Sequence, residues 1–215
     1  MQLRQLQTHL ERTYEVSIPH DVDDFIVSQS MTGGPGHEVE QLIIVEGPND
    51  TLDVGLYIEH SIVDSLSDDD PALYLHDGNL ANFCVALEGV SHFLYLIWRA
   101  AHERTVSLLE LELQAEVDKF VLAAALFAHQ RRGQIPSNLT ERLFNEITFD
   151  PALDDETRNR YQSANHYAKK YCQWLSDRFL RRPASGLTTE LRRFYRLPGP
   201  EKIRAINAAA PAAAP

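Results

Sequence analysis

Residues 79–132 read NLANFCVALEGVSHFLYLIWRAAHERTVSLLELELQAEVDKFVLAAALFAHQRR, and this stretch decides the fold. Its apolar residues recur every three to four positions, which is the period of an amphipathic α-helix. The pattern breaks after Arg104, and Ser107 with Glu110 forms a capping box that starts a second helix. Two long helices joined by so short a turn must lie antiparallel, so the stretch predicts an αα-hairpin.

The helical period continues downstream of this hairpin. A shorter helix is expected at 138–147 and a long one at 154–181, so residues 79–182 are predicted to form a helical bundle. Residues 183–208 read as a basic amphipathic C-terminal segment, and the Ala/Pro tail at 209–215 is expected to be disordered.

Residues 1–78 are acidic and predict a small α+β segment in front of the bundle. The runs QLIIVE and TLDVGLYI flank GPND, and apolar and polar residues alternate strictly in the second run. Alternation of this kind is typical of a strand with one covered face, so we expect a β-hairpin at 41–58. The expected fold class is therefore mainly α: a helical bundle around a long antiparallel αα-hairpin, with a small N-terminal α+β segment.

The charge is unevenly distributed along the chain. Residues 1–80 carry sixteen acidic and two basic residues, which gives −14; residues 81–215 carry fifteen and eighteen, which gives +3 and a total of −11. An acidic front disfavours nucleic-acid binding, because phosphates repel it. We find no apolar leader and no uninterrupted apolar run of membrane length, so a cytoplasmic location without membrane contact is expected.

Two polar stripes follow the helices of the predicted αα-hairpin. A turn at residues 105–106 would place them opposite each other, as a ladder of ion pairs and hydrogen bonds that fixes the helix register. The expected pairs are Arg99 with Glu112, Tyr95 with Glu116, and His92 with Lys119.

Three interpretations of this ladder stay open: a structural seam, a partner-binding surface, and a catalytic or metal site. In the third, Glu88, His92 and Glu116 would serve as acid–base groups or ligands. Di-iron bundles need two Glu-x-x-His pairs, whereas the nearest spacing here is a single Glu88-x-x-x-His92. No metal or other cofactor is therefore predicted.

The basic C-terminal segment carries a candidate partner-binding patch. Its members are Arg192, Arg193, Phe194, Tyr195 and Arg196. An amphipathic helix of this kind docks its apolar side into a groove, either on a partner or on this protein's own acidic front. Basic and aromatic residues together also suit single-stranded nucleic acid, but the net charge of −11 disfavours it.

These patterns favour a non-catalytic adaptor or regulatory protein that binds another protein through its acidic front and basic C-terminal segment. A homo-oligomer is a further expectation for the partner. The alternative is a helical enzyme or metal-binding protein that uses Glu88, His92 and Glu116. The two hypotheses place the functional site in different parts of the chain: the first in the C-terminal segment, the second inside the αα-hairpin.

Overall fold

The computed structural model describes residues 1–31, 39–47, 51–145, 153–181 and 185–209. It confirms a mainly α fold with one small antiparallel sheet. The helices are α1 (Leu3–Tyr14), α2 (His60–Asp68), α3 (Asp77–Ala100), α4 (Leu108–Gln130), α5 (Leu139–Phe144), α6 (Asp155–Leu175), α7 (Leu187–Arg196) and α8 (Gly199–Ala209). The strands are β1 (Glu40–Glu46) and β2 (Leu52–Ile58). Apart from Ala209, the predicted disordered tail lies outside the described residues.

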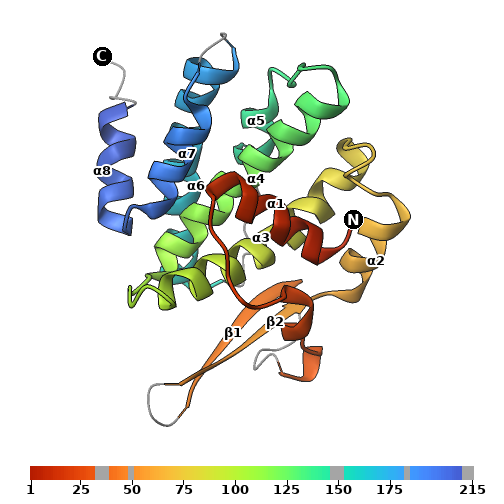
Figure 1. Cartoon of the computed structure of the whole chain (residues 1–215), viewed down its shortest axis with the longest axis vertical. Coiled ribbons are helices and arrows are strands. Elements are labelled where there is room, and N and C mark those ends of the chain that lie inside the picture. Colours follow the sequence, from red (N-terminus) through yellow and green to blue (C-terminus); the bar gives the residue numbers. More distant parts are fainter. Residues whose placement is uncertain (32–38, 48–50, 146–152, 182–184, 210–215) are drawn as a thin grey trace.

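The antiparallel αα-hairpin of α3 and α4 forms the centre of the bundle (Figure 1). Ser107 caps α4 as the sequence predicts, because its hydroxyl accepts a hydrogen bond from the Glu110 backbone N–H at 3.2 Å. At the start of α3, the imidazole of His76 accepts a hydrogen bond from the Gly78 backbone N–H. Helix α4 packs against α3 and against α6, so it is covered by two helices. This double cover explains why its sequence is apolar on most sides.

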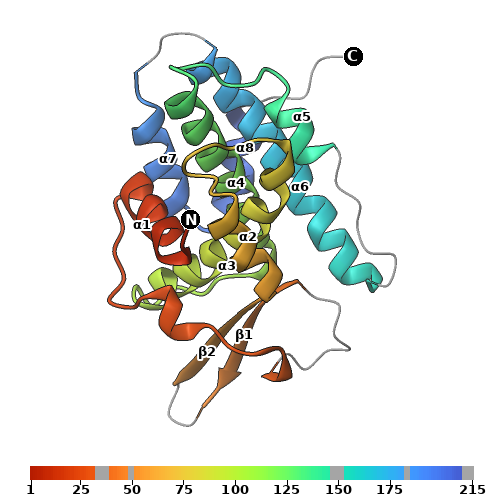
Figure 2. The same ribbon diagram turned by 90° about the vertical axis from the view of Figure 1, so that its right-hand side faces the viewer.

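The predicted β-hairpin is confirmed, and it extends from one end of the bundle (Figure 2). Leu42 pairs with Leu56 and Ile44 pairs with Val54 in an antiparallel register. Helix α3 covers the base of the hairpin, where Leu56 is fully buried. At the outer end Ile44 is 41% exposed, so the apolar face that alternation predicts is covered only near the base.

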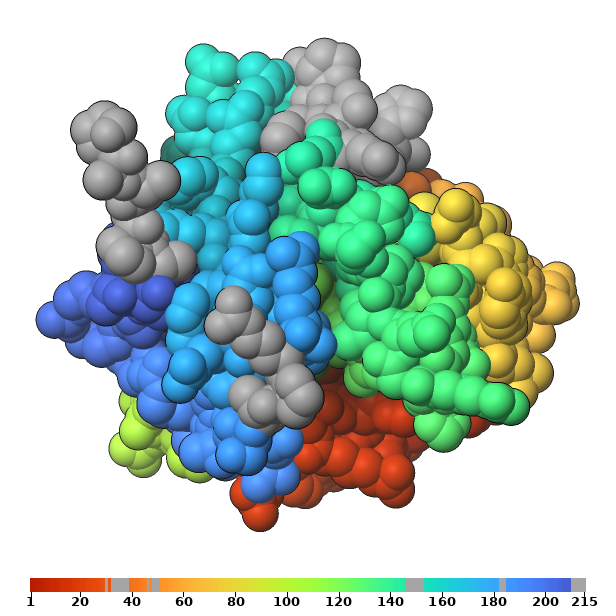
Figure 3. Space-filling view, turned by 90° about the horizontal axis from the view of Figure 1, so that it is seen from above, coloured from red at the N-terminus to blue at the C-terminus, as the bar shows by residue number. Residues whose placement is uncertain are grey.

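One hydrophobic core joins the N-terminal segment, the bundle and the C-terminal segment. Helix α1 buries Leu6 and Leu10 against the bundle, and α7 packs on α1. Figure 3 shows α1 in red beside α7 in blue, although they are far apart in the sequence. The same core continues to Ile206 on α8. The basic C-terminal segment is therefore part of the folded body.

Among the described helices, α3 is the one that is long and apolar enough to cross a membrane, with a mean hydropathy of 1.5 over its most apolar stretch. Within the fold, 67% of that stretch is buried by the rest of the protein. The apolar composition of α3 is thus accounted for by its place at the centre of the bundle.

Candidate functional site

A buried polar cluster, which we call the carboxylate cluster, lies where β1, α3, α4 and α6 meet. Its members are Glu40 on β1, Glu88 and His92 on α3, Glu112, Glu116 and Lys119 on α4, and Arg160 on α6. Helical residues three or four positions apart lie on the same face, which is why α3 and α4 each contribute several members. Charged groups in an apolar core cost free energy unless opposite charges accompany them, so their partners decide what the cluster can do.

His92 lies at the centre of the carboxylate cluster and is 7% exposed. Its Nδ1 is 3.5 Å from Glu40 Oε1, and its Nε2 is 3.4 Å from Glu112 Oε2. Burial lowers the pKa of His92, but the carboxylates of Glu112 and Glu40 outweigh burial and raise that pKa well above its usual value. The imidazole is thus held between two carboxylates that come from different elements.

Lys119 joins the other two carboxylates of the cluster. Its ammonium lies 2.7 Å from Glu88 Oε2 and 2.8 Å from Glu116 Oε1. Burial lowers the pKa of Lys119, yet Glu116 and Glu88 together raise it well above its usual value. Burial also raises the pKa of both acids; Lys119 outweighs burial at Glu88, whose pKa is lowered, whereas burial dominates at Glu116, whose pKa is raised. Glu88 therefore holds its charge more readily than Glu116.

Several buried polar atoms of the cluster make no hydrogen bond with any described residue. They are Glu40 Oε1, His92 Nε2, Glu116 Oε2 and Arg160 Nε. In addition, one ligand atom from each of Glu88, His92 and Glu112 lies within 4.8 Å of the other two. One nitrogen and two carboxylate oxygens gathered in this way form a candidate metal-ligand set.

Gly89 lets the sheet reach this cluster. A Cβ at Gly89 would lie 2.9 Å from Glu40 Cγ and 3.0 Å from Leu56 Cδ1, which is too close for normal van der Waals contact. Glycine inside a helix is about 1 kcal/mol less favourable than alanine, so its presence in α3 has to be offset by the packing that it permits. That packing brings a strand carboxylate beside His92.

The helices of the αα-hairpin do exchange polar contacts, but the partners differ from the expected ladder. The observed contacts are Arg99 with Glu110 at 3.4 Å, Tyr95 with Glu110 at 2.6 Å, His92 with Glu112 at 3.4 Å, and Lys119 with Glu88 at 2.7 Å. For Arg99, Tyr95 and His92, the partner on α4 precedes the expected one. The reason is that α3 ends at Ala100 and Glu103, with φ of 53°, turns the chain before residues 105–106.

The acid–base set drawn from the sequence is only partly assembled. Glu88 and His92 come together, but Glu116 pairs with Lys119 and Glu112 occupies the place beside His92. Sequence reasoning missed Glu40 and Arg160 altogether, because they come from elements outside the αα-hairpin. One sequence pattern did indicate Glu40. It lies two positions from Leu42 on β1, so its side chain is on the same face of the strand as the apolar residues that face the core.

A second buried polar network lies between α1, α3, α4 and α8. Asp118 accepts hydrogen bonds from Tyr14, Ser91 and Gln114, and Gln114 accepts one from Lys202. These five side chains are at most 1% exposed. Their polar atoms are hydrogen-bonded to one another, so this network is a structural link between helices and lacks the unpartnered atoms of the carboxylate cluster.

The aromatic residues of the candidate partner-binding patch are buried in the protein's own core. Phe194 stacks on Tyr171 with ring centroids 4.0 Å apart, and Tyr195 stacks on Tyr14 at 4.1 Å. Both side chains are at most 1% exposed. They hold α7 against α1 and α6.

The arginines of the same patch also contact the chain itself. Arg192 forms an ion pair with Glu15 at 2.6 Å, and Arg196 donates hydrogen bonds to the backbone carbonyls of Tyr14 and Glu15, each at 3.0 Å. Arg193 pairs with Glu190 on its own helix. Of the two docking modes left open by the sequence, the structure shows contact with the protein's own N-terminal region.

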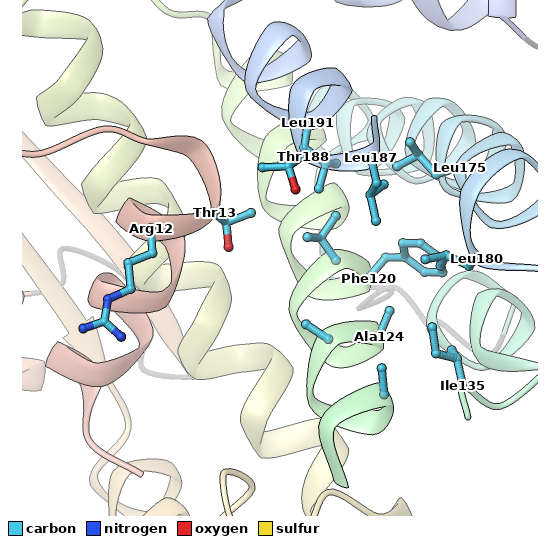
Figure 4. A pocket seen from close by; sticks show the side chains of 13 residues that line it. Arg12, Thr13, Phe120, Ala124, Ile135, Leu175, Leu180, Leu187, Thr188 and Leu191 are labelled. Carbon is cyan, nitrogen blue, oxygen red and sulfur yellow. The ribbon is translucent and has the colours of Figure 1, made fainter. Parts of the chain in front are cut away.

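A separate cavity of about 420 Å³ lies between α1, α4, α6 and α7 (Figure 4). Phe120, Leu187 and Leu191 are among its apolar walls, while the guanidinium of Arg12 points away from it. The polar side chains that remain at its wall are threonines. This cavity therefore adds no acid–base or metal-binding group to the carboxylate cluster.

Comparison with known proteins adds no family to these observations. The interpretation of the carboxylate cluster therefore rests on its own geometry and chemistry. No protein-family model matches this chain, and neither a curated protein nor a solved structure matches it.

Proposed function

We propose that this protein binds a divalent transition-metal ion in the carboxylate cluster, through Glu88, His92 Nε2 and Glu112. The observation that carries the proposal is the set of Glu88, His92 and Glu112, whose ligand atoms lie within 4.8 Å of one another. Within it, His92 Nε2 lies 3.4 Å from Glu112 Oε2 and makes no hydrogen bond with any described residue. A buried polar atom left unpartnered costs about 1–3 kcal/mol, and coordination of a metal ion would remove that cost.

The charge of the cluster supports a cation. Its four carboxylates, Glu40, Glu88, Glu112 and Glu116, face two permanent cations, Lys119 and Arg160. The raised pKa of His92 favours its protonated form in the metal-free protein, which makes the sum −4 + 3 = −1. A metal ion would displace that proton, and with the neutral imidazole that coordination requires the sum becomes −4 + 2 = −2. A divalent ion would balance this sum in a region where uncompensated charge is costly.

The ligand types narrow the choice of metal. Imidazole nitrogen suits Zn²⁺ and Fe²⁺, carboxylate oxygen suits Mn²⁺, and none of the three ligands is a soft sulfur donor of the kind Cu⁺ prefers. Three protein ligands leave a coordination position for water, as in catalytic zinc sites. Glu88 has a side chain that is 24% exposed, so the site reaches the surface at this ligand. If the bound metal activates water, the candidate base is Glu116, whose Oε2 makes no hydrogen bond with any residue that the structure describes.

The test is a metal titration of the purified full chain after treatment with a chelator. Zn²⁺ and Mn²⁺ are added separately, and the bound ion is counted by elemental analysis after gel filtration. We expect one ion per chain, with binding lost in His92→Gln and in Glu112→Gln. His166→Gln changes an exposed histidine on α6 and serves as the matched control.

Wild-type protein that keeps its helical circular dichroism yet retains neither metal would refute the proposal. Equal binding by wild type and His92→Gln would also refute it, because the ion would then sit elsewhere.

A second candidate function is a protein-interaction role as an adaptor or regulatory subunit. The observation that favours it is the outer end of the β-hairpin, where Ile44, Val45 and Leu52 are 41%, 55% and 46% exposed. Exposed apolar groups on a projecting element are typical of interaction sites. This surface differs from the C-terminal patch, whose aromatic residues are occupied within the fold.

The adaptor proposal is tested by capture from native extract on immobilised protein. A stoichiometric partner retained by wild type and lost by the Ile44→Lys, Leu52→Lys double variant would support it. Ile44 and Leu52 lie on the same face of the sheet, so the double variant places two charges on one surface. Identical capture by both proteins would exclude this surface.

A further inference from the structure

Strand β1 and helix α3 approach each other most closely at Gly89. A Cβ at this position would lie 2.9 Å from Glu40 Cγ and 3.1 Å from Glu40 Oε1. Any larger residue would push the glutamate side chain away from α3. The approach therefore depends on glycine in the middle of a helix, where glycine is otherwise unfavourable.

The close approach places Glu40 on one side of the His92 ring. Glu40 Oε1 is 3.5 Å from Nδ1, while Nε2 on the other side of the ring is 3.4 Å from Glu112 Oε2. Glu40 has a side chain that is 11% exposed, and its Oε1 makes no hydrogen bond to any described residue, so this oxygen is available to accept one from the Nδ1–H that lies 3.5 Å away. The two ring nitrogens thus face different carboxylates, one on the sheet and one on the bundle.

We infer that Glu40 is a positioning residue for the metal site, holding His92 Nδ1–H so that Nε2 is directed at the ion. The inference rests on the proposed function, since it assigns the role of a residue outside the ligand set. A histidine ligand generally donates its other ring N–H to a carboxylate or carbonyl, which fixes the tautomer and the ring orientation. The β-hairpin would then be coupled to metal binding through one side chain.

The competing explanation is that Glu40 and His92 form an ion pair that only fastens the hairpin to α3. Both explanations predict a loss of stability when Glu40 is removed. Only a positioning role predicts a change in the coordination of the metal, so the test has to measure a property of the bound metal, such as its affinity or its absorption spectrum.

The experiment uses the full chain with Zn²⁺ for affinity and Co²⁺ for its visible absorption spectrum. Glu40→Ala is expected to weaken Zn²⁺ binding about 10- to 100-fold and to alter the Co²⁺ spectrum, although all three ligands remain. Glu40→Gln is expected to recover part of the affinity, because its amide oxygen can still accept the Nδ1 proton.

Gly89→Ala tests the same contact from the other side, and Gly55→Ala is its matched control. Gly55 is on β2, and a Cβ there would lie 2.9 Å from Val27 Cγ1, the same closest distance as at Gly89 but without any contact to Glu40. Gly89→Ala should weaken Zn²⁺ binding as Glu40→Ala does, whereas Gly55→Ala should bind as wild type does.

Wild-type affinity and an unchanged Co²⁺ spectrum in both Glu40→Ala and Gly89→Ala would overturn the inference and leave the proposed function intact. If wild type binds no metal, the proposed function is refuted. The protonation of the His92 ring nitrogens is then measured in the metal-free protein by nitrogen-15 NMR. A His92 Nδ1–H resonance that disappears in Glu40→Ala but persists in Gly55→Ala supports the positioning contact. A resonance that is the same in both variants overturns it.

Discussion

Lys202 on α8 is a fully buried ammonium group. Its Nζ lies over the rings of Tyr95, Phe194 and Tyr195, at 4.6, 4.8 and 5.7 Å from the ring centroids. Burial lowers the pKa of Lys202 to about 7, although the nearby carboxylates of Glu110 and Asp118 oppose the shift. The folded protein therefore releases this proton near neutral pH, whereas the unfolded chain holds it up to an ordinary lysine pKa of about 10.4.

This difference makes the free energy of unfolding depend on pH. Below pH 7 the lysine is charged in both states, so its unfavourable burial is fully present. Between pH 7 and 10 the unfolded chain binds more protons than the folded one, and stability therefore rises with pH. The slope approaches about 1.4 kcal/mol per pH unit in the middle of that range, but half of the folded molecules have already lost the proton at pH 7. The gain from pH 7 to pH 9 is therefore about 2 kcal/mol.

The assay is urea unfolding, followed by circular dichroism at pH 7 and pH 9. Lys202→Met keeps the length and apolar contacts of the side chain but cannot ionise, so its stability should gain about 2 kcal/mol less than wild type over this interval. Lys170→Met removes a half-buried lysine whose ammonium donates a hydrogen bond to Asn207, and it should follow the wild-type profile. Parallel profiles for wild type and Lys202→Met would refute the reasoning.

Three further predictions concern other buried and exposed groups. Asp118 accepts hydrogen bonds from three buried side chains, so Asp118→Ala should lower the free energy of unfolding by about 3–5 kcal/mol in urea; a loss under about 1 kcal/mol would contradict this. Arg192 pairs with Glu15 in a partly exposed site, so Arg192→Ala should change stability by less than about 1 kcal/mol, and a loss above about 2 kcal/mol would mean that the pair contributes more than an exposed one. Cys172 is fully buried, and burial raises its pKa well above the usual value, so this thiol should not react with Ellman's reagent before urea unfolds the chain; rapid labelling of Cys172 in the native protein would contradict this.

The central part of the fold could be predicted from the sequence because its information is local. The αα-hairpin follows from a helical period and from the Ser107 cap, both of which operate within a few residues. The β-hairpin follows from alternation around GPND. In each case the hydrogen bonds that define the element join residues close in sequence.

The composition of the carboxylate cluster could not be predicted in the same way. Its ladder depends on the angle and offset of α3 against α4, and the left-handed turn at Glu103 sets that offset. The partner of His92 lies seven residues before the expected one, about two helical turns along α4, which is how Glu112 comes to lie beside His92 in place of Lys119. Glu40 lies on β1 and Arg160 on α6, so the spacing of residues within the αα-hairpin cannot predict their place in the cluster.

The opposite charges of the N-terminal and C-terminal segments contribute little to the contact between these segments. The acidic front and the basic C-terminal segment do meet, at α1 and α7, but the buried part of that contact is the aromatic stack of Tyr14 and Tyr195. Arg192 and Glu15 form an ion pair only at its partly exposed edge, where solvent screens it. Buried charge is concentrated instead around His92, where four carboxylates face two permanent cations and an imidazole whose pKa is raised well above its usual value. Even with His92 protonated, the carboxylates of the cluster outnumber its cations by one. An excess of that kind is stable when a bound cation or shared protons balance it, which is why metal content is the property that separates a functional cluster from a structural one.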